Sequence, residues 1–332
     1  MSAISEDHLR TVMFAYTKVL SPSAQVIAIF ANVLNVITFC QIGLRDSVNI
    51  TFLLLSISDL VYVALDTCKG IASVIALSPW QNDLPVSMIT VGVIIQFYQY
   101  IFLDASTCME TYLAITRCCC VAMPLRFKNI FTFQRTVLIN AVILMCNTVF
   151  RIPILSSYYL TWQTNPFTNL TKLAFYPYSS FQILNFIELV VARTVCPVIV
   201  LLISTVCSLI LARSLIQASL NRKRMTNVSG YHGDVNKNKN QVLKAKEVQL
   251  VKAVTLVIML LGFLQLILSL FSLAQAAMPE LFPGRKYRNL HGVITFVVNH
   301  LILLHCAYKI GIYYLFNTRF RAIVKMLFHV HV

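Results

Sequence analysis

The sequence predicts an all-helical (all-α) membrane protein, a bundle of seven transmembrane helices with a short amphipathic helix after the last span. The first observation is composition: 58% of the 332 residues are hydrophobic and 12% are charged, with a mean hydropathy of +0.74. That is more apolar side chain than the core of a soluble domain needs. The second observation is length, because several apolar runs reach the roughly 20 residues that a helix needs to cross a hydrocarbon layer of about 30 Å.

Seven apolar segments reach this length and define the domain organisation. Residues 1–23 form an amino-terminal segment, residues 24–316 the transmembrane domain, and residues 317–332 the amphipathic helix with a short tail. The predicted spans are residues 24–44, 48–77, 86–120, 136–159, 181–213, 250–277 and 290–316. An odd number of crossings places the two termini on opposite sides of the membrane.

The distribution of basic residues predicts the orientation. The odd-numbered connections and the tail carry most of them: Arg45, Arg126, Lys128, Arg135, Arg222, Lys223, Arg224, Lys237, Lys239, Lys244, Lys246, Arg319, Arg321 and Lys325. The even-numbered connections carry Lys172, Arg285, Lys286 and Arg288. By the positive-inside rule the odd-numbered connections face the cytosol, and the amino terminus lies outside. The same pattern explains the net charge of +15 without a nucleic-acid partner.

Two polar segments lie on the predicted cytoplasmic side. Residues 214–249 form the longest polar connection, with Gly230, Gly233 and alternating Lys and Asn, and they predict a mobile loop. After the last span, Arg319, Arg321 and Lys325 alternate with apolar residues at helical spacing. This predicts an interfacial helix against the inner leaflet, so membrane lipid is a partner of the tail as well as of the spans.

Several spans carry short motifs that belong together in one family of membrane proteins. They are Asn32 with Asn35, the run Leu55–Leu60, Arg117 followed by Pro124 and Leu125, Pro197, and the run Tyr313–Arg321. With these motifs the chain resembles rhodopsin-like (class A) G-protein-coupled receptors over nearly its whole length. The stretches 43–50 and 117–128 look most like invertebrate, particularly molluscan, chemosensory or peptide-receptor-like branches.

The resemblance implies a multi-pass plasma-membrane receptor that binds an extracellular chemosensory small molecule or peptide and activates a heterotrimeric G protein. It implies that Arg117 is released toward the cytosol on activation and that Tyr313 belongs to the same switch. Thr116 stands where the family has an acid that restrains the arginine, which predicts raised basal activity. Gly92 stands where the third span usually has a cysteine, so we expect the usual outer disulfide to be absent.

Charged residues within the spans are costly unless they are paired or protonated. The resemblance implies that Asp59 and Ser106 help to hold a sodium ion, but Lys309 would project into the same region and compete with it. One interpretation is a polar cluster of Asp59, Ser106, Lys309 and Glu110, with Asn32 nearby, in which the lysine replaces the ion. The other is that Lys309 reaches toward inner headgroups and Glu110 stays protonated.

Further polar residues are candidates for the ligand cavity that the resemblance implies. Asp104 in the third span and Arg193 in the fifth are expected to lie near it. Two interpretations stay open: the pair cancels two costly charges, or a charged group of a ligand inserts between them. The other candidates, which can also serve to join helices, are Gln96, Gln99, Tyr100, Thr295, Asn299 and His300.

Other functional classes find less support in the sequence. It contains no nucleotide-binding glycine loop, paired-histidine metal motif or nucleophile elbow, so no enzyme activity, cofactor or metal site is predicted. Asn169 begins a glycosylation sequon in a predicted outer loop. The alternative function is a transporter or channel that uses Asp59, Asp104, Glu110 and Arg193 as a charged pathway. The absence of internal repeats argues against that alternative.

Overall fold

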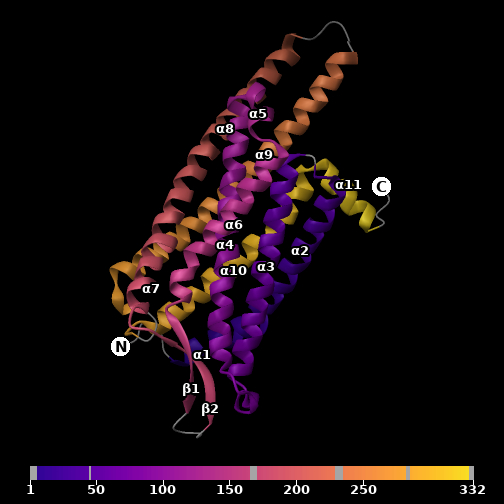
Figure 1. Cartoon of the computed structure of the whole chain (residues 1–332). Helices are drawn as coiled ribbons and strands as arrows, with labels where there is room; N and C mark the ends of the chain where they lie inside the picture. Colours follow the sequence, from indigo (N-terminus) through magenta and orange to yellow (C-terminus); the bar gives the residue numbers. More distant parts are fainter. Residues whose placement is uncertain (1–5, 45, 165–169, 229–234, 282–284, 329–332) are drawn as a thin grey trace.

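The computed structural model describes residues 6–44, 46–164, 170–228, 235–281 and 285–328. Within these ranges, seven helices are long and apolar enough to cross a membrane, which confirms the predicted seven-helix bundle. The helices lie side by side as one elongated bundle (Figure 1). Their membrane-length stretches are Thr11–Ile42, Ser47–Ala76, Met88–Cys120, Phe133–Leu155, Phe181–Ser214, Thr255–Ala277 and Arg288–Phe316.

Two of the spans contain a π-helical turn, and a short helix or strand lies in most connections. The first span consists of α1 (Glu6–Ala15), the π-helical turn η1 (Tyr16–Leu20) and α2 (Ser21–Ile42). The next three spans and their connections are α3 (Ser47–Ala76), η2 (Pro79–Asp83), α4 (Met88–Ala122), α5 (Pro124–Ile130) and α6 (Phe133–Leu155). Then follow β1 (Tyr158–Thr164), β2 (Thr171–Pro177), α7 (Phe181–Val190), the π-helical turn η3 (Val191–Val195), α8 (Cys196–Val228), α9 (Val235–Ala277), η4 (Pro279–Leu281), α10 (Arg288–Phe316) and α11 (Thr318–Leu327).

Local sequence signals explain where several helices begin and end. The side chains of Asp46, Thr132 and Asn317 accept hydrogen bonds from backbone N–H groups in the first turns of α3, α6 and α11, at 3.3, 3.4 and 3.1 Å. These contacts satisfy donors that have no partner within the helix. At the end of α2, Gly43 adopts a φ of 94°, a conformation that a glycine reaches without steric cost.

The segment of residues 214–249, predicted as a mobile loop, is helical where the structure describes it. α8 continues to Val228 and α9 begins at Val235, so both helices extend through most of this segment and project beyond the neighbouring helices in Figure 1. The reason is composition. Both flanks contain the good helix formers Leu, Ala, Gln and Lys, while Gly230 and Gly233 fall between the two helices. Polarity was a poor sign of irregular backbone in this segment.

The predicted boundaries also fail at the first and fourth spans. Residues 6–23 are helical, and the apolar stretch of the first span begins at Thr11 rather than at residue 24. The fourth span ends at Leu155 rather than at residue 159, because the hydroxyls of Ser156 and Ser157 bond back to the carbonyls of Pro153 and Ile154. The chain then enters strand β1 at Tyr158, where the sequence predicted continued helix.

Strands β1 and β2 form an antiparallel hairpin at one end of the bundle (Figure 1), with Tyr158 opposite Pro177 and Thr164 opposite Thr171. Backbone hydrogen bonds tie this hairpin to the start of α4: Leu173 N–H donates to the Pro85 carbonyl at 2.8 Å, and Ser87 N–H donates to the Leu173 carbonyl at 3.0 Å. All ten cysteines are free. Backbone pairing, rather than a disulfide, therefore holds the hairpin against the start of α4. We call this end of the bundle the hairpin end.

Helix α11 lies at the opposite end, which we call the α11 end. It docks through Phe320, which is fully buried against Phe39 of α2 and Tyr313 of α10, with ring centroids 5.3 and 5.7 Å apart. Phe52 of α3 completes the aromatic cluster at 4.7 Å from Tyr313. Arg319 and Arg321 are more exposed than the buried Phe320 between them. The amphipathic helix expected after the last span is therefore present.

Candidate functional site

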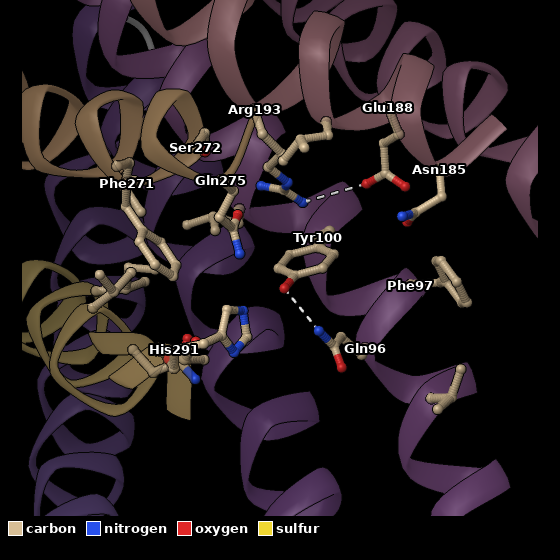
Figure 2. A pocket seen from close by; sticks show the side chains of 18 of the residues that line it. Gln96, Phe97, Tyr100, Asn185, Glu188, Arg193, Phe271, Ser272, Gln275 and His291 are labelled. Carbon is tan, nitrogen blue, oxygen red and sulfur yellow. Dashed lines mark hydrogen bonds and ion pairs between the residues drawn. The ribbon is translucent and has the colours of Figure 1, made fainter. Parts of the chain in front are cut away.

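A cavity of about 400 Å³ opens among α4, α7, η3, α9 and α10. It lies toward the hairpin end, since it is lined by Val93 near the start of α4, by Tyr158 of β1 and by His291 near the start of α10. The volume falls at the lower end of the roughly 300–1,000 Å³ range of small-molecule sites. Figure 2 shows the polar and aromatic side chains that meet around it.

Five of the predicted ligand-site residues line this cavity: Gln96, Tyr100, Arg193, Thr295 and Asn299. On α4, residues 93, 96, 100 and 103 repeat at the helical period, so they share the face that the cavity uses.

The other three predicted ligand-site residues do not line the cavity. Gln99 points toward α3, where its amide bonds Asp66 and Lys69 at 2.8 Å each. His300 lies edge-on to Tyr16 of the first span, with ring centroids 6.4 Å apart. Asp104 lies on α4 one turn beyond Tyr100, where it pairs with arginines. Gln99 and His300 do not line this cavity because their helices turn these side chains toward neighbouring spans.

Asp104 belongs to a network of two acids and two bases that joins three spans. Arg193 of η3 bonds Asp104 at 3.3 Å, and Arg151 of α6 forms ion pairs with both Asp104 and Glu188 of α7. Arg151 is 1% exposed, so its charge is compensated almost entirely by protein groups. The pairing of Asp104 with Arg193 was one of the two interpretations from sequence. The sequence prediction did not include Arg151 and Glu188 in this network. Each is a charged residue within an apolar run, and that pattern was the available signal for a buried ion pair.

Arg193 is placed over an aromatic ring at the wall of the cavity. Its guanidinium carbon lies 3.8 Å from the centroid of the Tyr100 ring, within the range of a cation–π contact. The Tyr100 hydroxyl accepts a hydrogen bond from Gln96 Nε2 at 2.8 Å (Figure 2). Arg193 sits in the π-helical turn η3, a type of insertion that re-aims side chains and is frequent at functional sites. Sequence periodicity alone does not reveal such a turn.

Tyr158 closes the cavity from the hairpin. Its ring packs against Phe97 of α4, Phe175 of β2 and Phe181 of α7, with centroids 5.6, 5.3 and 4.8 Å away. Burial, reinforced by the nearby Glu188 carboxylate, raises the pKa of Tyr158 to about 12. The phenol is therefore neutral at physiological pH and retains its proton as a hydrogen-bond donor.

A second charged cluster is buried in the middle of the bundle. Asp59 of α3 accepts hydrogen bonds from Ser106 Oγ and Lys309 Nζ, both at 2.6 Å. Lys309 of α10 also forms an ion pair with Glu110 of α4, and His305 Nε2 lies 3.0 Å from Glu110 Oε1. Asp59, Glu110 and Lys309 are at most 1% exposed. The structure thus brings together Asp59, Ser106, Glu110 and Lys309, as the interpretation of a polar cluster predicted. Lys309 does not extend toward the inner headgroups, as the other interpretation would require.

Asn32 is placed beside this region but bonds elsewhere. Its amide nitrogen donates to the carbonyls of Ala28 and Cys306, at 2.9 and 3.1 Å, and so ties α2 to α10. The contacts of Asn32 given by the structure are thus with backbone rather than with the carboxylates.

A third polar group, not predicted from sequence, joins the first three spans. Asp66 accepts hydrogen bonds from Gln25 Nε2 and Gln99 Nε2, each at 2.8 Å, and pairs with Lys69 one turn later on α3 at the same distance. Every oxygen of the Asp66 carboxylate therefore has a partner. Such polar contacts hold helices together within a bilayer.

The two residues of the predicted switch lie at the α11 end. Arg117 is buried near the end of α4, with 7% of its surface exposed. The preceding Thr116 donates its hydroxyl hydrogen bond to the Leu113 carbonyl at 2.8 Å, within its own helix. Tyr313 is 1% exposed within the aromatic cluster, and its hydroxyl has no hydrogen-bond partner among the described residues. The glycosylation prediction at Asn169 falls outside the described residues.

The described residues contain no group of three or more His, Cys, Asp or Glu side chains suited to a metal ion.

Comparison with curated proteins found no match. A family model described as the serpentine type 7TM GPCR chemoreceptor Srw matches residues 19–331, which includes nearly the whole of all seven spans and α11. The chain therefore belongs to the Srw family of serpentine seven-transmembrane G-protein-coupled chemoreceptors.

Proposed function

We propose that this chemosensory receptor lies in the plasma membrane with its amino terminus outside and binds an extracellular small molecule in the cavity beside Arg193. The observation that carries the proposal is the cavity itself, which combines about 400 Å³ of space with charged, amide and aromatic groups. That volume suits a small molecule better than a whole peptide. Members of this family are receptors and are generally not enzymes.

The orientation is supported by the distribution of charge. Arg126, Arg135 and Arg319 are exposed at the α11 end, the end that the positive-inside rule assigns to the cytosol. The cavity lies toward the other end and would then be reached from outside.

We propose further that Arg117 and Tyr313 form the G-protein switch of a rhodopsin-like mechanism. A ligand shifts a receptor between arrangements only by binding them with different affinities. In the arrangement described here Arg117 is buried, and the Tyr313 hydroxyl lacks a hydrogen-bond partner among the described residues. A rearrangement that exposes Arg117 to a heterotrimeric G protein would also allow that hydroxyl to gain a partner. Membership of a rhodopsin-like, molluscan-type branch stays a prediction from the motifs.

A transporter or channel remains the alternative, and pairing of the charges speaks against it. Asp59 and Glu110 both contact Lys309, and Asp104 contacts Arg151 and Arg193. Charges that neutralise one another across helices stabilise a bundle without providing a continuous route for ions.

Expression in reporter cells tests the proposed function. We expect the receptor to raise G-protein activation above that of cells without it, even before ligand is added, because Thr116 replaces a restraining acid. The same cells with their G-protein α subunits deleted serve as the control and should give no signal. Ion flux that persists in those deleted cells would instead support the transporter or channel.

A further inference from the structure

The cavity presents two opposite charges that do not fully satisfy each other. Arg193 Nη2 and Glu188 Oε1 lie 3.9 Å apart (Figure 2), whereas a charge-assisted hydrogen bond is about 2.7–2.9 Å long. Arg193 Nη2 is buried and has no hydrogen-bond partner among the described residues. Both residues line the cavity. An unbonded guanidinium N–H donor of Arg193 thus lies at the wall beside the Glu188 carboxylate, whose Oε1 already pairs with Arg151 and which can accept further hydrogen bonds.

The charge balance of this wall limits what the cavity can accept. The network contains the carboxylates of Asp104 and Glu188 and the guanidinium groups of Arg151 and Arg193, so its formal total is zero. A ligand with one net charge would leave an uncompensated charge at a site where the Arg193 and Glu188 side chains are only 22% and 12% exposed, which is unfavourable. A molecule that carries one positive and one negative group can bond both Arg193 and Glu188 without changing the total.

The rest of the cavity is suited to a compact apolar group. Leu103, Phe271, Val298 and Ile302 line it from α4, α9 and α10, whereas the charged pair comes from α7 and η3. Figure 2 places Phe271 on the opposite side of the cavity from Glu188. Asn185, one turn before Glu188 on α7, lies beside its carboxylate in the same view and adds an amide to the polar side.

We propose that the cavity binds a small zwitterion of the amino-acid type, with its carboxylate on Arg193, its ammonium on Glu188, and an apolar side chain against α9 and α10. This inference rests on the proposed function, because it takes this cavity as the ligand site and adds the class of ligand that the cavity binds. The Tyr100 ring beneath Arg193 fixes the guanidinium in place and so orients the bound carboxylate.

Thermal unfolding of the purified full-length receptor in lipid nanodiscs tests this inference without any G protein. The probes are L-phenylalanine and L-leucine as apolar zwitterions, γ-aminobutyrate as a zwitterion without an apolar side chain, and phenethylamine and 3-phenylpropionate as analogues with one charge each. A ligand that binds only the folded state raises the unfolding midpoint. We expect L-phenylalanine or L-leucine to raise it, and each one-charge analogue to need at least a tenfold higher concentration for the same shift.

A charge-neutral double variant provides the matched comparison. Glu188→Gln combined with Arg193→Gln removes both ligand contacts and leaves Asp104 paired with Arg151, so the wall stays neutral and the receptor should fold. In this variant we expect the preference for the zwitterion over the one-charge analogues to disappear. Arg135→Gln, an exposed arginine at the α11 end, should leave the preference unchanged.

The outcomes separate this inference from the proposed function. If neither L-phenylalanine nor L-leucine shifts the wild-type midpoint, or if γ-aminobutyrate or a one-charge analogue binds as tightly as they do, the ligand class is wrong. Basal G-protein activation in cells would still stand in that case. A zwitterion-dependent shift in a receptor that never activates a G protein would support the ligand class and contradict the proposed signalling.

Discussion

Replacing Lys309 with methionine is expected to lower the free energy of unfolding by about 3–5 kcal/mol, the typical cost of removing one partner from a buried ion pair. The variant leaves Asp59 and Glu110, 1% and 0% exposed, without the ammonium that both contact. Methionine matches the length of the lysine stem, so loss of packing contributes little. Surface expression and the unfolding midpoint of the purified receptor measure the effect.

Two further variants separate the effect of losing the Lys309 charge from the effect of changing its shape. Adding Asp59→Asn and Glu110→Gln to Lys309→Met removes all three charges, and this triple variant should regain much of the lost stability, because a neutral polar cluster avoids the desolvation cost. Lys18→Met, at an exposed lysine of the first span, should change little. A Lys309→Met receptor that folds and signals like the wild type would show that the cluster does not hold the bundle together.

The second large effect is expected at Arg117. We expect Arg117→Ala to reduce G-protein activation at least tenfold while the amount of receptor at the cell surface stays near that of the wild type. The physical reason is that an arginine at the mouth of the bundle offers five N–H donors to carbonyl groups of a partner, and alanine offers none. Activation in reporter cells, normalised to surface receptor, measures the loss.

The control for this variant is Arg319→Ala, which removes an exposed arginine of α11 at the same end of the bundle. It should retain most of the signal. Unchanged activation by Arg117→Ala would contradict the assignment of the switch, even if the receptor itself proved to be active.

Helix α4 connects the three sites on which these predictions depend. It carries Tyr100 at the cavity, Glu110 in the buried cluster and Arg117 at the α11 end. A ligand that draws Arg193 away from Asp104 changes the contacts of α4 with η3. Lys309 ties the middle of the same helix to α10, so a displacement of α4 is opposed by the buried cluster. In the proposed mechanism, the cluster would therefore influence how readily the two arrangements exchange.

The sequence was sufficient for the number and approximate position of the spans, because bilayer thickness fixes the length of an apolar helix directly. The sequence was insufficient to predict secondary structure where the helix or strand preference of individual residues competes with the polarity of the segment. Residues 214–228 and 235–249 are polar and nevertheless helical, and β1 begins where the fourth span was expected to continue. The aromatic residues Tyr158, Tyr159 and Trp162, together with Thr161 and Thr164, were the available signal for that strand.

For the site, the sequence identified which charged residues lie within membrane spans, but it did not identify their partners. Asp59, Glu110 and Lys309 stood out as charges within apolar runs, and two interpretations of Lys309 remained because spacing does not show how a helix is rotated. The same limit placed Gln99 in the cavity, whereas it faces Asp66. Glu188 and Arg193 come together through the π-helical turn η3, an irregularity that no periodic pattern encodes.

The account depends most on the direction in which the bundle crosses the membrane, with the cavity open to the outside and Arg117 delivered to the cytosol. Antibody staining of epitope tags at both ends, in intact and in permeabilised cells, tests it directly. We predict that the amino-terminal tag is stained on intact cells and the carboxy-terminal tag only after permeabilisation. Two tags on the same side of the membrane would contradict the seven crossings, and a reversed pair would place Arg117 where no G protein can reach it.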